Sequence, residues 1–145
     1  MSQLAEVTEH TQRGARGLIL PGAATEIGNP GEDTLLPATI AELERLGIRV
    51  REVALDGGFN VGPTTAALGD LAPKNVFIAG RQEPGSKRTQ RRMRRYRTGA
   101  EGRISHLKRS YGLDRSRLKG DEGRQIWTEW SILAYNADTL AVRER

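Results

Sequence analysis

One acidic residue stands inside the most basic part of this chain, with cationic residues at helical spacing on both sides. Arg97 precedes Glu101 by four residues and Lys108 follows it by seven, so a helix would place all three on one face. A carboxylate placed between two cations can be a metal ligand flanked by groups that hold phosphates. It can equally be an ion pair with Arg97 on a solvated helix, a contact worth about 0.3–0.5 kcal/mol.

Two glycines beside this acid favour the functional interpretation. Each glycine inside a helix costs roughly 1 kcal/mol relative to alanine. A purely structural, exposed helix has little reason to carry both Gly99 and Gly102 next to Glu101. Glycine does let a backbone or a nucleic-acid strand approach closely, so the pair supports a site at this position.

A second acid, Asp56, follows a run rich in β-branched residues and precedes two glycines. Ligands of open α/β sheets gather beyond the carboxyl ends of the strands, where such a carboxylate can bind a metal. Gly57 and Gly58 would let the backbone turn sharply beside it. Asp-Gly is also an ordinary turn sequence, so this feature alone does not define a site.

The charge of the chain is concentrated in one segment. The 145 residues carry a net charge of +5, but residues 81–124 hold 15 basic and 5 acidic residues. Arginine supplies 19 of the 23 bases of the chain, and arginine is suited to bidentate phosphate contacts. The segment therefore indicates a polyanionic partner, although a basic block is often only a solvated surface.

Composition excludes several classes of protein. The absence of cysteine rules out disulfide scaffolds, zinc-thiolate sites and cysteine nucleophiles. A mean hydropathy of −0.57 and the absence of a long apolar run exclude a membrane span. Residues 1–10 lack the pattern of a secretory signal, so we expect a cytoplasmic protein.

Helices and strands are predicted to alternate, which indicates an α/β sheet with parallel neighbours. A helix capped by Asp33 ends before Gly47, which suits a left-handed C-terminal position. The predicted strands are a short one at the start of 16–27, then 48–55 and 75–79; the other predicted helices are 64–71, 87–111 and 124–142. The last helix carries an apolar stripe that should pack against the sheet; its members are Ile126, Trp130, Leu133, Ala137 and Leu140.

Several of these residues together resemble bacterial insertion-sequence transposases of the DDE type, over nearly the whole chain. Residues 28–33 and 56–59 resemble the central strands of that family, and residues 97–109 resemble the helix that bears its third acid. Residues 111–120, 126–127 and 134–136 continue the resemblance. The family signature is Tyr, two residues, Arg, three residues, Glu, six residues, Lys. Arg97, Glu101 and Lys108 keep its spacing, and Arg94 stands where the Tyr would be.

The resemblance implies a retroviral-integrase-like (RNase-H-like) core in which three carboxylates hold two divalent metal ions. Asp56 would be the second acid and Glu101 the third, both metal ligands and both catalytic. The metal would be Mg²⁺ or Mn²⁺, and the reaction would be phosphoryl transfer that cuts and joins DNA strands. Transposon ends and target DNA would be the partners, with Arg97 and Lys108 beside the scissile bond. The candidates for DNA contact are Arg91, Arg92, Arg94, Arg95, Arg97, Lys108 and Arg109.

The same resemblance implies an incomplete domain. No Asp precedes Gly28, and residues 1–11 resemble the strand that follows the one bearing the first acid. We therefore expect a single partial catalytic domain, residues 1–145, that lacks the first strand and is inactive alone. Its predicted parts are a sheet region (12–80), the basic helix and its connection (81–123) and a C-terminal helix (124–142).

Three alternatives stay open. The chain could be a non-enzymatic nucleic-acid-binding module that uses residues 81–124 as a phosphate platform. It could instead supply its acids to an upstream transposase polypeptide. A sheet edge exposed by a missing strand would also favour pairing with another chain, so a homo-oligomer is a further expectation.

Overall fold

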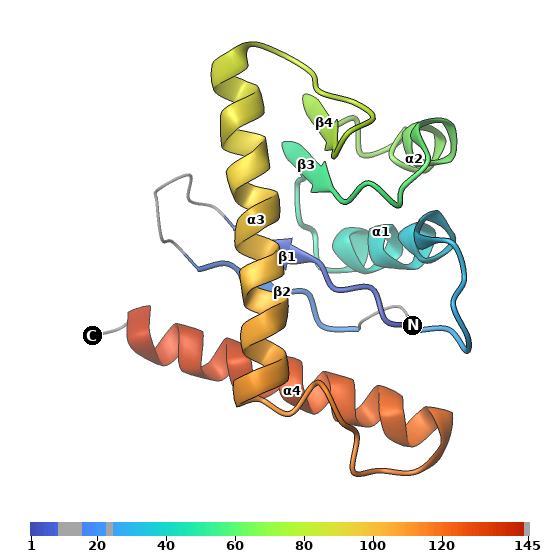
Figure 1. Cartoon of the computed structure of the whole chain (residues 1–145), viewed down its shortest axis with the longest axis vertical. Helices are drawn as coiled ribbons and strands as arrows, with labels where there is room; N and C mark the ends of the chain where they lie inside the picture. The colour runs from blue at the N-terminus through green and yellow to red at the C-terminus, as the bar shows by residue number, and fades with distance from the viewer. Residues whose placement is uncertain (9–15, 23–24, 144–145) are drawn as a thin grey trace.

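The computed structural model describes residues 1–8, 16–22 and 25–143, and within them four α-helices and two small sheets (Figure 1). Residues 12–15, the first part of the predicted sheet region, lie outside these ranges. The elements are β1 (Glu6–Val7), β2 (Leu18–Ile19), a 3₁₀ turn (Glu32–Leu35), α1 (Leu36–Arg45), β3 (Glu52–Leu55), α2 (Val61–Ala67), β4 (Asn75–Ile78), α3 (Lys87–Ser110) and α4 (Gly120–Arg143).

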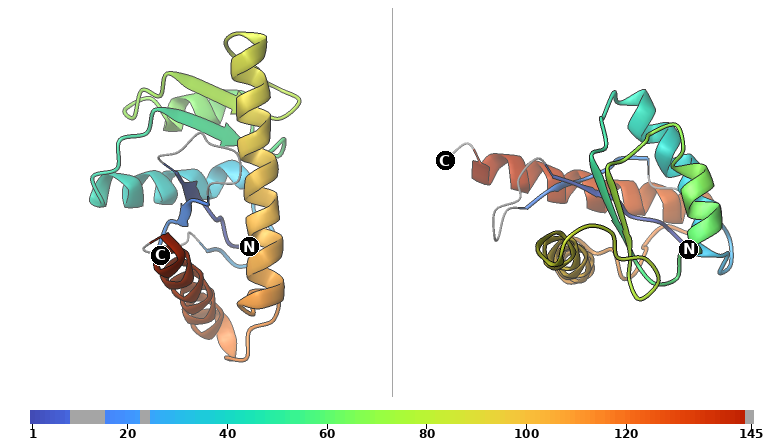
Figure 2. Two further views of the ribbon diagram at one scale, coloured as in Figure 1. Left: turned by 90° about the vertical axis from the view of Figure 1, so that its left-hand side faces the viewer. Right: turned by 90° about the horizontal axis from the view of Figure 1, so that it is seen from above.

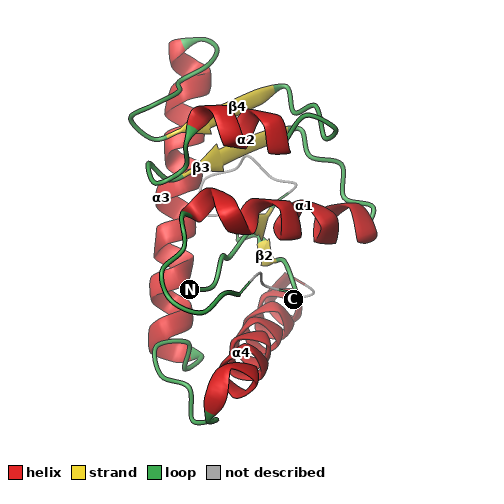
Figure 3. Ribbon diagram, turned by 90° about the vertical axis from the view of Figure 1, so that its right-hand side faces the viewer, coloured by secondary structure: helices red, strands yellow, loops and turns green. Residues whose placement is uncertain are grey.

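The parallel pair predicted from the sequence is present. β3 and β4 run parallel, with Glu52 opposite Asn75 and Leu55 opposite Ile78. Helices α1 and α2 lie on one side of this pair and α3 lies on the other (Figure 3). The apolar residues between the strands and the two shorter helices form one core cluster: Leu36, Ile40, Phe59, Leu68 and Ile78.

The two N-terminal strands belong to a second, separate sheet. β1 and β2 are antiparallel, with Glu6 opposite Ile19, and α4 packs against β2. In the described ranges the strands thus form two two-stranded sheets rather than one continuous sheet. A second core cluster of Ile19, Leu107, Ile132 and Tyr135 lies beside this pair. Because α3 buries Met93 near one end and Leu107 near the other, this long helix spans both halves of the molecule (Figure 2).

The predicted start of α1 is wrong. Asp33 lies inside the 3₁₀ turn, and α1 begins after Leu35 with no side-chain cap. Pro37 stands in the first turn, where its missing N–H leaves no helical hydrogen bond unmade. The end of the helix is as predicted, because Gly47 has a φ of 66° that favours glycine.

The long basic helix has the predicted bounds to within a residue. Ser86 caps it, with its Oγ accepting a hydrogen bond from Thr89 N at 3.3 Å. Gly112, with a φ of 73°, follows its end. α2 begins three residues earlier than predicted, since Pro63 is tolerated within a first turn.

α4 packs against β2, as expected of a helix that should cover a sheet, but the face that packs is not the predicted apolar stripe. The predicted stripe is exposed: Trp130 is 70% and Leu133 is 68% accessible. The buried residues are Thr128, Ser131, Ile132, Tyr135 and Thr139. Backbone carbonyls satisfy two of these buried hydroxyls: Thr128 Oγ1 lies 3.0 Å from Arg124 O, and Ser131 Oγ lies 2.8 Å from Tyr111 O. Thr139 Oγ1 has no hydrogen-bond partner in the described part of the chain.

Candidate functional site

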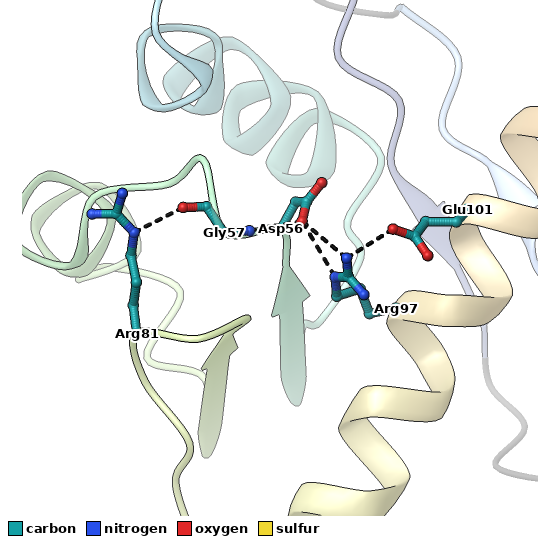
Figure 4. A network of polar contacts seen from close by, with 5 residues as sticks. All are labelled: Asp56, Gly57, Arg81, Arg97 and Glu101. Atoms are coloured by element: carbon teal, nitrogen blue, oxygen red, sulfur yellow. Dashed lines mark hydrogen bonds and ion pairs between the residues drawn. The ribbon is translucent and has the colours of Figure 1, made fainter.

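Arg97 joins the two acids that the sequence singles out. Its Nη2 lies 3.2 Å from Asp56 Oδ1 and 2.8 Å from Glu101 Oε1, and its Nε lies 3.3 Å from the same Asp56 oxygen (Figure 4). The side chain of Arg97 is 29% exposed, whereas those of Asp56 and Glu101 are 57% and 53% exposed. The two acids therefore converge on one cation at a position open to solvent.

The fold explains this convergence. Asp56 follows the last residue of β3, at the carboxyl end of the parallel pair, and α3 packs directly against β3. Arg97 and Glu101 are one helical turn apart on α3, so both face the same strand end. Lys108 lies two turns further along the helix and is exposed, so the sequence spacing does not bring it to the carboxylates.

Hydrogen bonds on the other side of Asp56 hold the loop that follows β3. Arg81 Nε donates to Gly57 O at 2.8 Å (Figure 4). Arg81 Nη1 donates to Asn60 Oδ1 at 3.1 Å. Asn60 Nδ2 in turn donates to Asp33 Oδ2 at 3.2 Å. Gly57 N donates to Asp56 Oδ1 at 2.7 Å, which fixes the carboxylate at the strand end.

The two glycines after Asp56 lie in close contacts: Gly57 faces a backbone carbonyl, which cannot move easily, and Gly58 faces the end of the flexible Glu32 side chain. A Cβ at Gly57 would lie 3.0 Å from Ala79 O, and one at Gly58 would lie 2.3 Å from the carboxyl carbon of Glu32. Gly58 thus makes room for a third acidic side chain. Sequence reasoning missed Glu32, because only the tertiary fold brings the 3₁₀ turn beside the end of β3.

Glu32 differs electrostatically from a typical surface acid. Its Oε2 is buried and has no hydrogen-bond partner in the described part of the chain. Partial burial raises the pKa of this carboxyl above its ordinary value of 4.5, and the negative charges of Asp56 and Asp33 raise it further. The neighbourhood of Asp56 is therefore acidic on the side that faces away from Arg97.

The carboxylates of Asp56 and Glu101 suit a hard divalent cation, but they supply only two ligands. Their carboxylate oxygens are the ligands that Mg²⁺ prefers, and one guanidinium nitrogen already contacts both groups. Across the described ranges, however, no group of three or more His, Asp or Glu side chains is arranged to hold a metal ion. The two residues fit a cation completed by water or by phosphate oxygens, with Arg97 as its competitor.

No family model, curated protein or solved structure matches the chain. None of the helices in the described ranges has the length and apolar character that a bilayer crossing needs.

The predicted DNA-contact residues fall into two groups. Arg92 is not on an open surface: it pairs with Glu52, and the two side chains are only 29% and 14% exposed. Glu52 also accepts a hydrogen bond from Asn75 Nδ2 at 2.8 Å, so Arg92 ties α3 to both parallel strands. Arg94 is exposed and contacts both carboxylate oxygens of Glu83 at 2.6 Å.

Exposed arginines gather on the N-terminal half of α3. Four arginines line an open hollow of about 560 Å³ on the N-terminal half of α3; we call Arg88, Arg91, Arg94 and Arg95 the arginine surface. Arg109 lies five turns from Arg91 on the same side of the helix and is also exposed. Arg88 was missed as a candidate, although its three-residue spacing from Arg91 was a readable signal.

Open space surrounds Gly99 and Gly102, the two glycines of α3 on either side of Glu101. A Cβ at Gly102 would meet nothing within 4 Å, and one at Gly99 would meet only the end of the Arg103 side chain at 3.9 Å. No backbone within the described ranges uses the approach that these glycines permit. The α3 surface at this point is thus free for an external ligand.

The environment of Glu32 leads to a pH-dependent stability prediction. A raised pKa means that the folded state binds the Glu32 proton more tightly than the unfolded state, so its contribution to stability falls as pH rises through 4.5 and above. We expect Glu32→Gln to raise the melting temperature at pH 7 by about 1–2 °C, with no gain at pH 3.5. Thermal unfolding followed by circular dichroism checks this; Glu44→Gln, an exposed acid on α1, is the control. An equal gain at both pH values would contradict it.

Proposed function

We propose that this chain is part of the catalytic domain of a DDE-type DNA transposase, in which Asp56 and Glu101 contribute two metal ligands and α3 binds DNA. The observation that carries the proposal is the convergence of Asp56, Arg97 and Glu101 from β3 and α3. The arginine surface on the same helix supports it, because a phosphodiester backbone needs closely spaced guanidinium groups.

Each residue has a distinct role in this proposal. Asp56 and Glu101 would hold Mg²⁺, which supplies activation of an attacking hydroxyl and stabilisation of the leaving oxygen in phosphoryl transfer. Arg97 offsets one of the two negative charges of these carboxylates when no metal is bound. If a cation displaced Arg97 from the two carboxylates, the Arg97 guanidinium would be available to hold a DNA phosphate beside the reacting bond.

The proposed function also implies a specific fold, the RNase-H-like core. An RNase-H-like core would join the β1–β2 and β3–β4 pairs into one sheet, and a further strand bearing an acid would be needed beside Asp56. Two carboxylates hold a divalent cation less firmly than three. We therefore expect the chain alone to bind DNA and metal but not to cleave DNA at a measurable rate.

Metal binding tests the acidic site. We expect Mn²⁺ to bind the wild-type chain weakly and this binding to be lost in Asp56→Asn/Glu101→Gln. Arg97→Gln is expected to increase the affinity about three- to tenfold, because each exposed ion pair that the metal displaces is worth ~0.2–1 kcal/mol. Titration followed by the free Mn²⁺ electron paramagnetic resonance signal measures both effects.

The control for this titration is Asp70→Asn/Glu44→Gln, which removes the same two charges at exposed positions away from the site. If the control loses as much Mn²⁺ as the site variant, the binding is a general effect of charge. An unchanged or lower affinity in Arg97→Gln would contradict the competition between guanidinium and metal.

A non-enzymatic nucleic-acid-binding module is the second candidate, and the arginine surface favours it equally. It predicts DNA binding that Asp56→Asn/Glu101→Gln leaves unchanged in the presence of Mn²⁺. The transposase proposal predicts that Mn²⁺ strengthens DNA binding through these two residues, since a cation held by their carboxylates would attract a phosphate. Comparing DNA affinity with and without Mn²⁺ separates the two candidates.

A further inference from the structure

The exposed apolar face of α4 has the spacing of a coiled-coil seam. Its residues follow one another at intervals of four, three, four and three, which is the alternation that keeps one side of a helix facing a partner helix; they are Ile126, Trp130, Leu133, Ala137 and Leu140. All five are exposed, and no other helix or strand lies below α4 in Figure 1. We call these residues the α4 stripe.

A contiguous stripe of this kind differs from scattered surface apolar residues. Single exposed leucines are normal, whereas a row that includes a tryptophan marks an interaction surface. The opposite face of α4 is already used by β2 and α3, through Ile132 and Tyr135. The helix is therefore fixed on the molecule by one face and presents the other outward.

The charges of α4 indicate what covers the stripe. Its first turn is acidic, with Asp121 and Glu122, and its last turn is basic, with Arg143. In an antiparallel helix pair, the acidic end of each copy lies beside the basic end of the other, and the two helix dipoles oppose. Glu122 and Arg143 are three heptads apart, so both flank the same side of the seam. A parallel pair would instead place the acidic ends together.

We propose that the α4 stripe is the interface of a homodimer, in which α4 of a second copy of this chain packs antiparallel against it. The stripe spans 14 residue steps, or about 21 Å of helix. A contact of that length lies at the low end of specific interfaces. A dissociation constant on the order of micromolar is therefore expected.

Sedimentation of the whole chain tests the dimer. Wild type is expected to show a monomer–dimer equilibrium at micromolar concentrations, and Leu133→Glu is expected to weaken it at least tenfold. The reason is that position 133 is central, so an antiparallel pair would bring the two introduced carboxylates close together. Val142→Glu is the matched control: it changes an exposed apolar residue of the same helix outside the stripe, and the dimer should persist.

Charge exchange tests the orientation. Glu122→Arg and Arg143→Glu should each weaken the dimer, because each places like charges at the two ends of the seam. Arg143 also donates to Arg16 O of its own chain, so the double variant is the decisive one. It should restore the dimer, because the facing ends again carry opposite charges. A cross-link gives a second readout, since the chain has no cysteine. Leu133→Cys should be joined by a short bis-maleimide, whereas Val142→Cys should not.

Three results would overturn the proposal: a wild-type chain that stays monomeric at 100 µM, a dimer that Leu133→Glu leaves unchanged, or equal cross-linking at positions 133 and 142. The second result would place a dimer elsewhere, such as at a sheet edge. Circular dichroism of each variant shows whether the fold is retained; the exposed positions lie outside both core clusters. The outcome is independent of metal or DNA binding.

Discussion

Replacing Arg88, Arg91 and Arg95 with glutamate is expected to lower the affinity of this chain for duplex DNA at least about a hundredfold. Each lost guanidinium–phosphate contact costs ~1 kcal/mol or more, and three together reach that factor. The slope of log affinity against log salt should also become shallower by about 2.7, because three fewer counterions are released on binding. The three side chains are exposed on α3, and the helix packs through Met93 and Leu107 on its other side.

Fluorescence anisotropy of a labelled duplex, measured across a series of NaCl concentrations, gives both quantities. The matched control is the triple change of Arg49, Arg51 and Lys74 to glutamate, which alters net charge equally at exposed positions before β3 and β4. These positions lie at the opposite end of the parallel strands from Asp56. If the control loses as much affinity, binding follows net charge rather than the arginine surface, and α3 is not the interface.

Arg92 is left out of this variant because the structure gives it another role. Its pairing with the half-buried Glu52 makes charge reversal there a change of stability as well as of binding. Sequence spacing alone could not separate Arg92 from Arg91 and Arg95, since all three belong to one basic run. Their roles differ because only one side of α3 packs against β3, and the sequence alone does not show which side that is.

Elements whose signals are local were predicted closely: β4 and α3 keep their predicted bounds to within a residue, whereas β3 begins at Glu52, four residues later than predicted. β3 and β4 are short runs of apolar and β-branched residues, and α3 lies between a serine cap and Gly112. Their positions follow from backbone and side-chain preferences within a few residues. The structure brings Asp56 and Glu101 to one guanidinium group, and their role as metal ligands, which the resemblance implies, stays a prediction.

Predictions that needed the packing of distant segments failed. The apolar stripe of α4 was expected to be buried, because an amphipathic helix usually hides its most apolar face. The structure buries Tyr135 together with Thr128 and Ser131, whose hydroxyls donate to backbone carbonyls, an arrangement that hydropathy does not register. Glu32 was missed for a similar reason, since its neighbours Gly58 and Asp56 are distant in sequence.

Among the polar side chains on the buried side of α4, we expect the loss of Asn136 to lower the free energy of unfolding most. Its Oδ1 accepts a hydrogen bond from Ile19 N at 2.8 Å, and its Nδ2 donates to Ile19 O at 2.8 Å. The side-chain amide thus pairs with the free edge of β2 as a neighbouring strand would. Asn136→Ala leaves both backbone groups of a buried residue without a partner.

The expected loss is about 2–3 kcal/mol of unfolding free energy, because two hydrogen bonds disappear and Ile19 stays out of contact with water. For a domain of this size the melting temperature should fall by about 5–10 °C. Urea unfolding followed by circular dichroism measures the change. Gln125→Ala, an exposed substitution on the same helix, is the control and should stay within about 0.5 kcal/mol of wild type.

Asn136→Asp separates the loss of hydrogen bonds from the loss of packing, because it keeps the shape of the side chain. One carboxylate oxygen can still accept from Ile19 N, but the other faces Ile19 O, so two acceptors are opposed. We expect this variant to be at least as unstable as Asn136→Ala at pH 7. It should recover part of the loss below about pH 4, where the protonated carboxyl supplies the missing donor. Equal stability of Asn136→Asp and wild type at pH 7 would show that the paired amide does not hold α4 to β2.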